Sequence, residues 1–139
     1  MRRSIVQRSS PEIGLRYLNV LDRAELGLGS EPWESLINAA LIGLLGIKEI
    51  GGNVRNVHSE ALIAVDEVPG GFLRLRHGLV KIGDENQAYL IDSDFFIKER
   101  RSNNDVGEIM AKFNRLAGNL FRWASTDHLR RALEPVPID

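Results

Sequence analysis

GLRYLNVLD, residues 14–22, decides the fold, because it is the first strand-like run after a polar and basic start. We predict that the strand covers residues 13–23 and that residues 1–12 form a flexible or weakly docked N-terminal segment. Apolar side chains occur on both alternating faces of this run, which is typical of a strand that is covered on two sides. The sequence therefore predicts a central strand of a sheet.

Three side chains of this strand, Arg16, Tyr17 and Asn19, are candidates for binding a ligand. Arg16 shares a face with apolar neighbours, and a buried guanidinium without a counter-charge is prohibitively unstable. Asp22 lies on the same face but six residues further on, about 20 Å along a strand, which is too far for an ion pair. The partner of Arg16 must therefore come from elsewhere. We favour an acid of this chain over the alternative, an anionic ligand in the concavity of the sheet.

The rest of the chain predicts helices and a meander of strands. Ser30 is a good N-cap and Pro32 is tolerated in the first turn of a helix whose apolar residues recur at three- and four-residue steps. Turns rich in Gly, Pro, Asn and Asp separate three strand-like runs, which predicts an antiparallel meander. The expected helices cover residues 31–45 and 105–124, with a short one ending near 133, and the expected strands cover 54–66, 72–82 and 87–98.

The predicted order is strand, helix, three strands and a long helix. A meander with one polar face needs a cover for its other face, and helices with single apolar stripes supply such a cover. We therefore expect an α+β fold in residues 13–135, forming a single domain. It would contain a curved antiparallel sheet of four or five strands, covered on one face by two helices. The long C-terminal helix would lie across the concave side.

Composition excludes several classes of function. The net charge of −1 gives no overall attraction to nucleic acid or anionic lipid. The chain has 0 cysteines, which excludes a thiolate nucleophile and cysteine-based metal sites and fits a reducing cytoplasm. The longest apolar run, residues 39–45, is too short to span a bilayer. We expect a cytoplasmic protein with no cofactor and with neither membrane nor nucleic acid as a partner.

Three short segments resemble landmarks of one protein family. GLRYLN at residues 14–19 is similar to the family's GLRY-x-N strand, LIDSD at 90–94 to its D-x-D strand, and FRWAST at 121–126 to its F-x-x-x-x-T helix junction. This is a sporadically distributed bacterial family of uncharacterised proteins, about twice this length. The resemblance covers about residues 13–135 and corresponds to the family's C-terminal half. It implies one part of a two-part α+β protein, and no particular activity.

Two positions depart from the pattern of that family. Asn114 stands where the resemblance implies a histidine, and Ser125 stands where it implies an apolar residue. The family's N-terminal half has no counterpart in the chain, so a truncated relative and a stand-alone domain are both open as interpretations.

Asp92 and Asp94 lie two residues apart on the last predicted strand, so both point to one face. A carboxylate pair of this kind could bind Mg²⁺ or share a proton in an enzyme. We favour a structural interpretation. A turn at residues 83–86 places Arg76 near Asp94 and Arg74 one step away, so cross-strand ion pairs on a solvated face account for both acids.

No other catalytic constellation stands out in the sequence. His58, His77 and His128 lie in three different elements and lack the spacing of metal ligands. No serine lies in a G-x-S-x-G elbow, and no glycine pair has the spacing of a phosphate loop. The pattern favours a protein that is not an enzyme.

Trp123 interrupts the apolar stripe of the long helix and lies among arginines, namely Arg122 beside it and Arg130 in the last short helix. An exposed tryptophan flanked by arginines has the composition of an interface hot spot. The alternative is that Trp123 packs under the last short helix.

These observations lead to two functional hypotheses. The first is a non-enzymatic protein-interaction module or homo-oligomerising domain, whose partner is another protein or a second copy, as in a homodimer. The alternative is a domain that binds a small apolar ligand in a cavity between the C-terminal helix and the sheet, by analogy with half-barrel folds.

Overall fold

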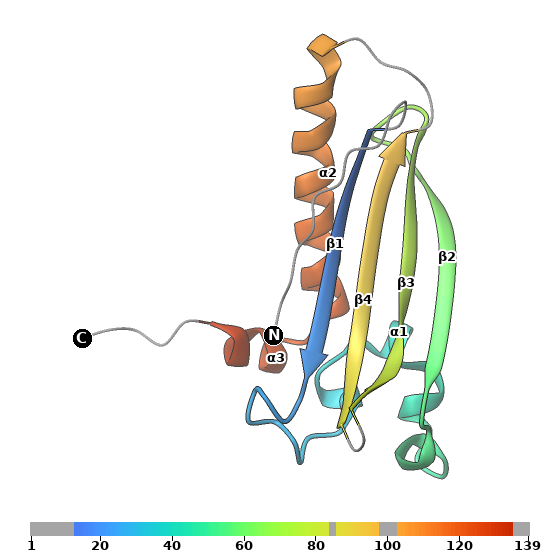
Figure 1. The fold of residues 1–139 in the computed structure, drawn as a ribbon, viewed down its shortest axis with the longest axis vertical. Coiled ribbons are helices and arrows are strands. Elements are labelled where there is room, and N and C mark those ends of the chain that lie inside the picture. Colours follow the sequence, from blue (N-terminus) through green and yellow to red (C-terminus); the bar gives the residue numbers. More distant parts are fainter. Residues whose placement is uncertain (1–12, 84–85, 98–102, 135–139) are drawn as a thin grey trace, which may run out of the picture.

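A computed structural model describes residues 13–83, 86–97 and 103–134 of the chain (Figure 1). Residues 1–12, for which the sequence predicts weak docking, lie outside the described part. The described elements follow the order strand, short helical turns, three strands and two helices, and the strands form one antiparallel sheet. The predicted α+β fold class is therefore confirmed.

The sheet has four strands in the order β1-β4-β3-β2. This order makes the first strand an edge of the described sheet, whereas the sequence predicted a central position for it. Its inner face is covered by a helix, and on the other face Leu18 and Val20 stay half-buried beside charged neighbours. Apolar residues on both faces therefore do not require a central position. The strands are β1 (Ile13–Asp22), β2 (Val57–Val65), β3 (Gly71–Ile82) and β4 (Asn86–Ile97).

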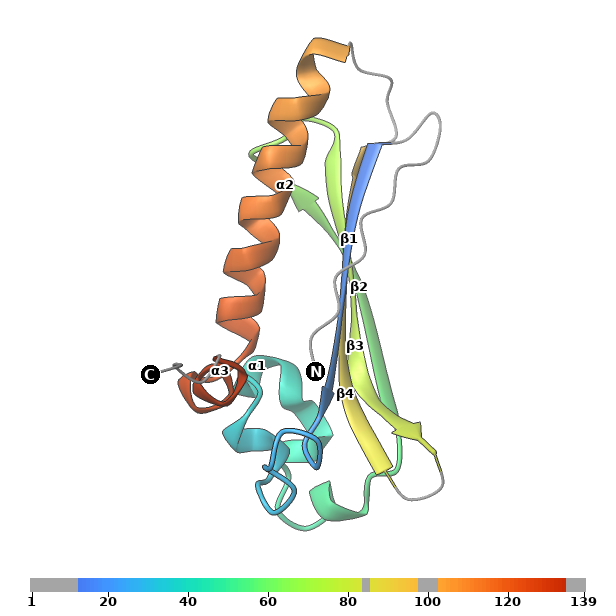
Figure 2. The same ribbon diagram turned by 60° about the vertical axis from the view of Figure 1, so that its left-hand side comes forward.

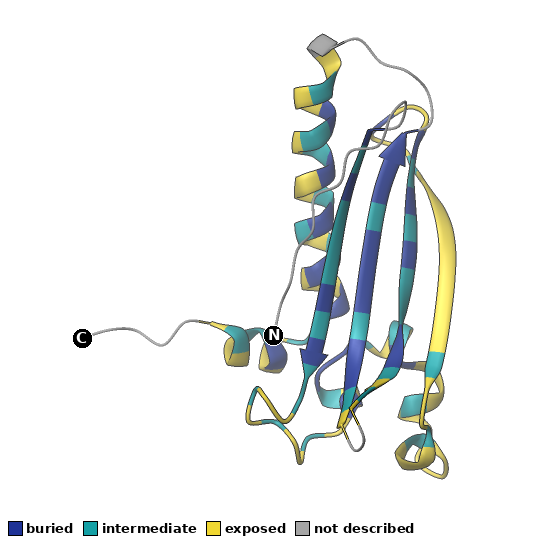
Figure 3. Cartoon of the chain, in the orientation of Figure 1, coloured by how far each residue is buried: buried dark blue, intermediate teal, exposed yellow. Residues whose placement is uncertain are grey.

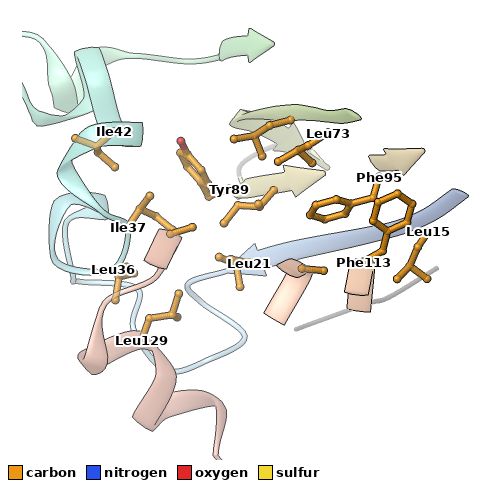
Figure 4. Close-up of a cluster of buried hydrophobic side chains, with 14 of the residues drawn as sticks. Leu15, Leu21, Leu36, Ile37, Ile42, Leu73, Tyr89, Phe95, Phe113 and Leu129 are labelled. Carbon is orange, nitrogen blue, oxygen red and sulfur yellow. The ribbon is translucent and has the colours of Figure 1, made fainter. Parts of the chain in front are cut away.

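Helix α2 (Asn103–Ala124) lies along one face of the sheet and packs mainly on β1 and β4 (Figure 2). Phe113 of α2 is fully buried, and its ring centroid lies 5.4 Å from that of Phe95 in β4 (Figure 4). Leu15 and Leu73 extend this core onto the neighbouring strands. The odd-numbered residues of the strands therefore form the inner face, and the even-numbered residues form the outer face.

The prediction of one continuous helix over residues 31–45 is wrong. The structure has several short helical segments there. The Asn38 side chain accepts a hydrogen bond from the backbone N–H of Ala40 (2.9 Å), which starts a new helical turn. The Asn38 backbone N–H donates to the carbonyl of Ala124 (2.8 Å), and Ile37 forms a β-bridge with Ser125. Pairing with the end of α2 thus overrides the helical periodicity. The pieces are η1 (Trp33–Ser35), α1 (Ala39–Ile42) and η2 (Gly43–Gly46), followed by η3 (Gly51–Asn53).

Helix α3 (Asp127–Leu133) begins at Thr126, which joins three segments. The Thr126 hydroxyl accepts a hydrogen bond from the N–H of Leu129 (3.2 Å) and donates one to the carbonyl of Ser35 (2.7 Å). The Thr126 backbone N–H donates to the carbonyl of Leu36 (2.9 Å). Leu129 is fully buried at this corner. The short helix predicted to end near residue 133 is present, and Thr126 holds it against the first helical turns.

Replacing Thr126 with alanine is expected to lower the free energy of unfolding by about 1–2 kcal/mol, because it removes both the N-cap of α3 and the bond to Ser35. Thr126→Ser keeps the hydroxyl and is the matched control, with an expected loss below about 0.5 kcal/mol. Urea unfolding measures both. An equal loss in the two variants would show that the methyl group, rather than the hydroxyl, holds the corner.

Candidate functional site

Six charged side chains form a ladder of ion pairs across all four strands on the outer face of the sheet. All six stand at even-numbered strand positions, so strand alternation places them on one face. The ladder holds three arginines and three acids, and its charges balance. Its members, here called the ionic ladder, are Arg16 of β1, Asp92 and Asp94 of β4, Arg74 and Arg76 of β3, and Glu60 of β2.

Arg16 and Asp92 form the tightest pair of the ionic ladder. The Arg16 Nε donates to Asp92 Oδ1 (2.8 Å) and Nη2 donates to Oδ2 (2.7 Å), which is the two-bond fork of a guanidinium on a carboxylate. The Asp92 side chain is only 4% exposed, and that of Arg16 is 30% exposed. The hydrogen bond to Asp92 raises the pKa of Arg16 against the opposing effect of burial. The partner of Arg16 is therefore an acid of this chain.

The remaining members extend the ladder to the far edge of the sheet. Arg76 Nη1 lies 3.8 Å from Asp92 Oδ2, and its Nε donates to Glu60 Oε1 (3.0 Å). Arg74 lies 3.5 Å from Glu60 and 3.9 Å from Asp94. Burial and the adjacent Asp92 charge raise the pKa of Asp94, and the surrounding arginines oppose this rise. Each acid of the ladder thus lies within reach of at least one guanidinium.

The register between β3 and β4 is shifted by two residues from the predicted one, in which Arg76 lies near Asp94. Arg74 stands opposite Asp94 and Arg76 stands opposite Asp92, because pairing continues to the end of the hairpin and includes Asn86. Asp92 is also buried, whereas we expected it on a solvated face. Its two carboxylate oxygens are both held by Arg16. Among the described residues, no group of three or more His, Asp or Glu side chains could hold a metal ion.

Tyr17 and Asn19 point to the opposite face from Arg16, under helix α2. The Tyr17 hydroxyl donates to Oδ1 of Asn114, the residue that stands where the family resemblance implies a histidine. Asn19 is 2% exposed, and its Oδ1 has no hydrogen-bond partner. The three ligand candidates of this strand therefore do not converge on one site.

A second polar group on the inner face was not found from the sequence. The Tyr89 hydroxyl donates to the carbonyl of Leu41 (3.2 Å), and its oxygen lies 2.8 Å from Nδ1 of His77. With this arrangement the Nδ1–H of His77 donates to the tyrosine oxygen. Burial raises the pKa of Tyr89 to about 12 and lowers the pKa of His77. Only the β3–β4 pairing brings His77 and Tyr89 together, so no local motif could have indicated the group.

The surface predicted around Trp123 is partly occupied by structural contacts. Trp123 is 49% exposed, so it does not pack under α3. Arg130 donates through Nη1 to the carbonyls of Ser125 (2.6 Å) and Arg122, and through Nη2 to Asp127. Arg130 thus fastens α3 to the end of α2, whereas Trp123 and Arg122 are exposed. Arg122 and Arg130 also line a surface hollow between the two helices.

Strand β2 presents an exposed apolar surface, which lies outside the site residues predicted from the sequence. Figure 3 shows that β2 is exposed along most of its length, and seven of its nine residues are classed as exposed. Leu62 on the outer face is 58% exposed and Ile63 on the inner face is 43% exposed. The available signal was the run Val57–Val65 itself, which has apolar residues at both alternating positions and no lysine, arginine or proline.

Comparison with protein-family models, with curated proteins and with solved structures gives no match to this chain. Within the described part of the chain, no helix combines the length and the apolar character that crossing a bilayer requires.

Asp92→Asn is expected to lower the free energy of unfolding by about 2 kcal/mol, because it removes the counter-charge of Arg16 at a nearly buried position. Glu60→Gln is the matched control at the exposed end of the ionic ladder, where an ion pair contributes less than about 0.5 kcal/mol. Urea unfolding of both variants tests this order. A loss at Glu60 as large as that at Asp92 would contradict a dominant role for the Arg16–Asp92 pair.

Acidification is expected to destabilise the protein through His77. Its folded-state pKa is lowered from 6.5, so the unfolded chain binds the proton more tightly. The free energy of unfolding should therefore fall as the pH drops below 6.5, until the pH reaches the folded-state pKa. Urea unfolding between about pH 7.5 and pH 5 measures the slope.

In His77→Gln this part of the pH dependence should be absent. His128→Gln is the control, because the His128 side chain is 51% exposed and lies in α3, away from Tyr89. An unchanged slope in His77→Gln would remove His77 as the cause.

Proposed function

We propose that this protein is a non-enzymatic protein-interaction module and that the outer edge of β2 is its contact element. The observation that carries the proposal is the exposure of β2 on both faces, with Leu62 and Ile63 as its large exposed apolar side chains. The absence of cysteine from the chain fits the cytoplasm as its location. The resemblance to the bacterial family remains part of this proposal, and it supplies no activity.

The backbone of β2 offers hydrogen bonds that another strand can complete. Within the described sheet β2 pairs only with β3, and β2 stands last in the strand order. In an antiparallel pair, alternate residues direct their N–H and C=O groups away from the partner strand. An extended segment that adds to this edge would bind these groups and cover Leu62 and Ile63, as in recognition by strand addition.

The edge of β2 lacks the features that usually prevent strand addition. Natural edge strands are protected by charged side chains, above all lysines, and by prolines, bulges or short length. The one acid of β2, Glu60, is paired with Arg74 and Arg76 of the neighbouring strand. Strand β2 has nine residues and none of these is lysine or proline. Its pairing with β3 runs without interruption from Val57 opposite Leu79 to Val65 opposite Gly71, so it contains no bulge. An unprotected edge of this length favours a physiological partner.

The other hypotheses have less support from the geometry. An apolar ligand between α2 and the sheet would compete for the space where the rings of Phe95 and Phe113 lie 5.4 Å apart. The Trp123 surface offers one exposed ring beside arginines, one of which is already bonded to the backbone. The carboxylates of the D-x-D segment are engaged by arginines, which favours a structural role over catalysis.

A double variant, Leu62→Lys with Ile63→Lys, tests the proposal, because charges on both faces of an edge strand block the addition of another strand. Sedimentation velocity of the purified protein and quantitative affinity capture from the native host measure binding to itself and to other proteins. We expect a defined partner or a second copy to bind the wild-type protein. We expect the double variant to bind it at least about tenfold more weakly.

Trp123→Lys is the matched control, since it places a lysine at an exposed apolar site away from the edge. It should bind as the wild-type protein does. If the double variant of β2 still binds and Trp123→Lys does not, the interaction takes place at the Trp123 surface and the proposal for β2 is wrong. A wild-type protein that binds neither itself nor a host protein would overturn the proposal.

A further inference from the structure

We infer that the occupant of the β2 edge is a second copy of this chain, paired antiparallel about Leu62, so that one sheet continues through both copies. This inference rests on the proposed function and names its partner.

Symmetry restricts how two copies of β2 can pair. Two identical antiparallel strands in one sheet are related by a two-fold axis perpendicular to the sheet, and directly opposite residues lie on the same face. Because faces alternate along a strand, each residue must face one of the same parity, so the axis passes beside a single residue. For the exposed centre of β2 the choices are Ala61, Leu62 and Ile63.

The side chains favour the axis at Leu62. An axis at Ile63 places Glu60 opposite the partner's Asp66, and like charges directly opposite are destabilising. An axis at Ala61 places the carboxylate of Glu60 opposite the partner's Leu62 and removes contact between the most exposed apolar side chains.

With the axis at Leu62, apolar residues meet apolar residues at the centre. Leu62 faces its own counterpart, and Ala61 faces the partner's Ile63 on the other side of the sheet. His58 then stands opposite the partner's Asp66, one residue beyond the end of β2, where the imidazole can donate to the carboxylate. Both large exposed apolar side chains of β2 are thereby covered, and one polar pair forms at each end.

The rest of the molecule is compatible with this pairing. Figure 1 shows no described element beside the outer edge of β2, whereas α2 lies along the other side of the sheet. The ionic ladder carries three charges of each sign, so the outer faces of two copies can lie side by side in one sheet without net repulsion. The other edge strand, β1, has no exposed residue along its whole length and offers less surface for a partner to cover.

Disulfide trapping tests the register, because the chain contains 0 cysteines and each introduced thiol is therefore unique. A disulfide requires Cα atoms about 4.4–6.8 Å apart and side chains that point toward each other. Residues offset by one position point to opposite faces, and same-face residues offset by two lie about 7–8 Å apart, so only directly opposite residues satisfy both conditions. Three variants, Ala61→Cys, Leu62→Cys and Ile63→Cys, are oxidised mildly and analysed on non-reducing gels. Leu62→Cys should form a covalent dimer at least roughly tenfold faster than Trp123→Cys, which reports random collision at an exposed site.

A mixture of Ala61→Cys and Ile63→Cys should form a mixed dimer faster than either variant does alone. Faster trapping of Ala61→Cys alone, or of Ile63→Cys alone, would overturn the register about Leu62. Sedimentation velocity of the wild-type protein from about 1 µM to 1 mM, with amide hydrogen exchange, tests self-pairing itself. Protection of every amide of β2 is expected, because self-pairing also bonds the alternate amides that a monomer leaves open.

A wild-type protein that stays monomeric, with protection only at alternate amides of β2, would overturn the second copy as the occupant. The proposed function would still hold if a host protein bound to the wild-type protein and did not bind to the double-lysine variant. Circular dichroism of each cysteine variant confirms that the fold is retained before trapping is compared.

Discussion

The pair formed by Arg16 and Asp92 is the interaction on which the arrangement of the sheet depends. It joins the first strand of the fold to the last strand of the meander by two charged hydrogen bonds. A slip of β1 by one residue would turn Arg16 toward the face under α2, away from Asp92. The same slip would expose Leu15 and Leu21, which are buried. One register is therefore selected by two requirements. The guanidinium must stay beside its carboxylate, and the leucines must stay buried.

That register has consequences for the two faces of the sheet. The inner face receives α2, and Phe113 meets Phe95 there. The outer face balances its charges within the ionic ladder, so it needs no helix to neutralise them. Because α2 packs mainly on β1 and β4, the two faces of β2 are both left without cover (Figures 2 and 3). The exposure of β2, the proposed contact element, thus results from the position of α2 over the β1–β4 half of the sheet.

Much of the local structure could be predicted from the sequence. The strands, the long helix and the short last helix follow from alternation, apolar stripes and turn residues, which depend on neighbours within a few positions. The need for a partner of Arg16 also follows from the sequence, because burying an unpaired charge is costly wherever the strand lies. Its identity does not follow, since Asp92 stands 76 residues away. The helix over residues 31–45 could not be excluded, because the competing bonds of Asn38 and Ile37 come from the end of α2.

The sequence by itself determined the strands, the long helix α2, the fold class and the charge that had to be neutralised in GLRYLNVLD. These properties depend on backbone preference and side-chain chemistry, which act over short distances along the chain. Only the tertiary structure decided that β1 and β2 are the edges of the described sheet, that Asp92 receives Arg16, and that Leu62 and Ile63 face solvent. The physical reason is that burial belongs to the arrangement of several elements. An apolar strand of the same sequence is a core strand when a helix lies over it and a contact surface when none does.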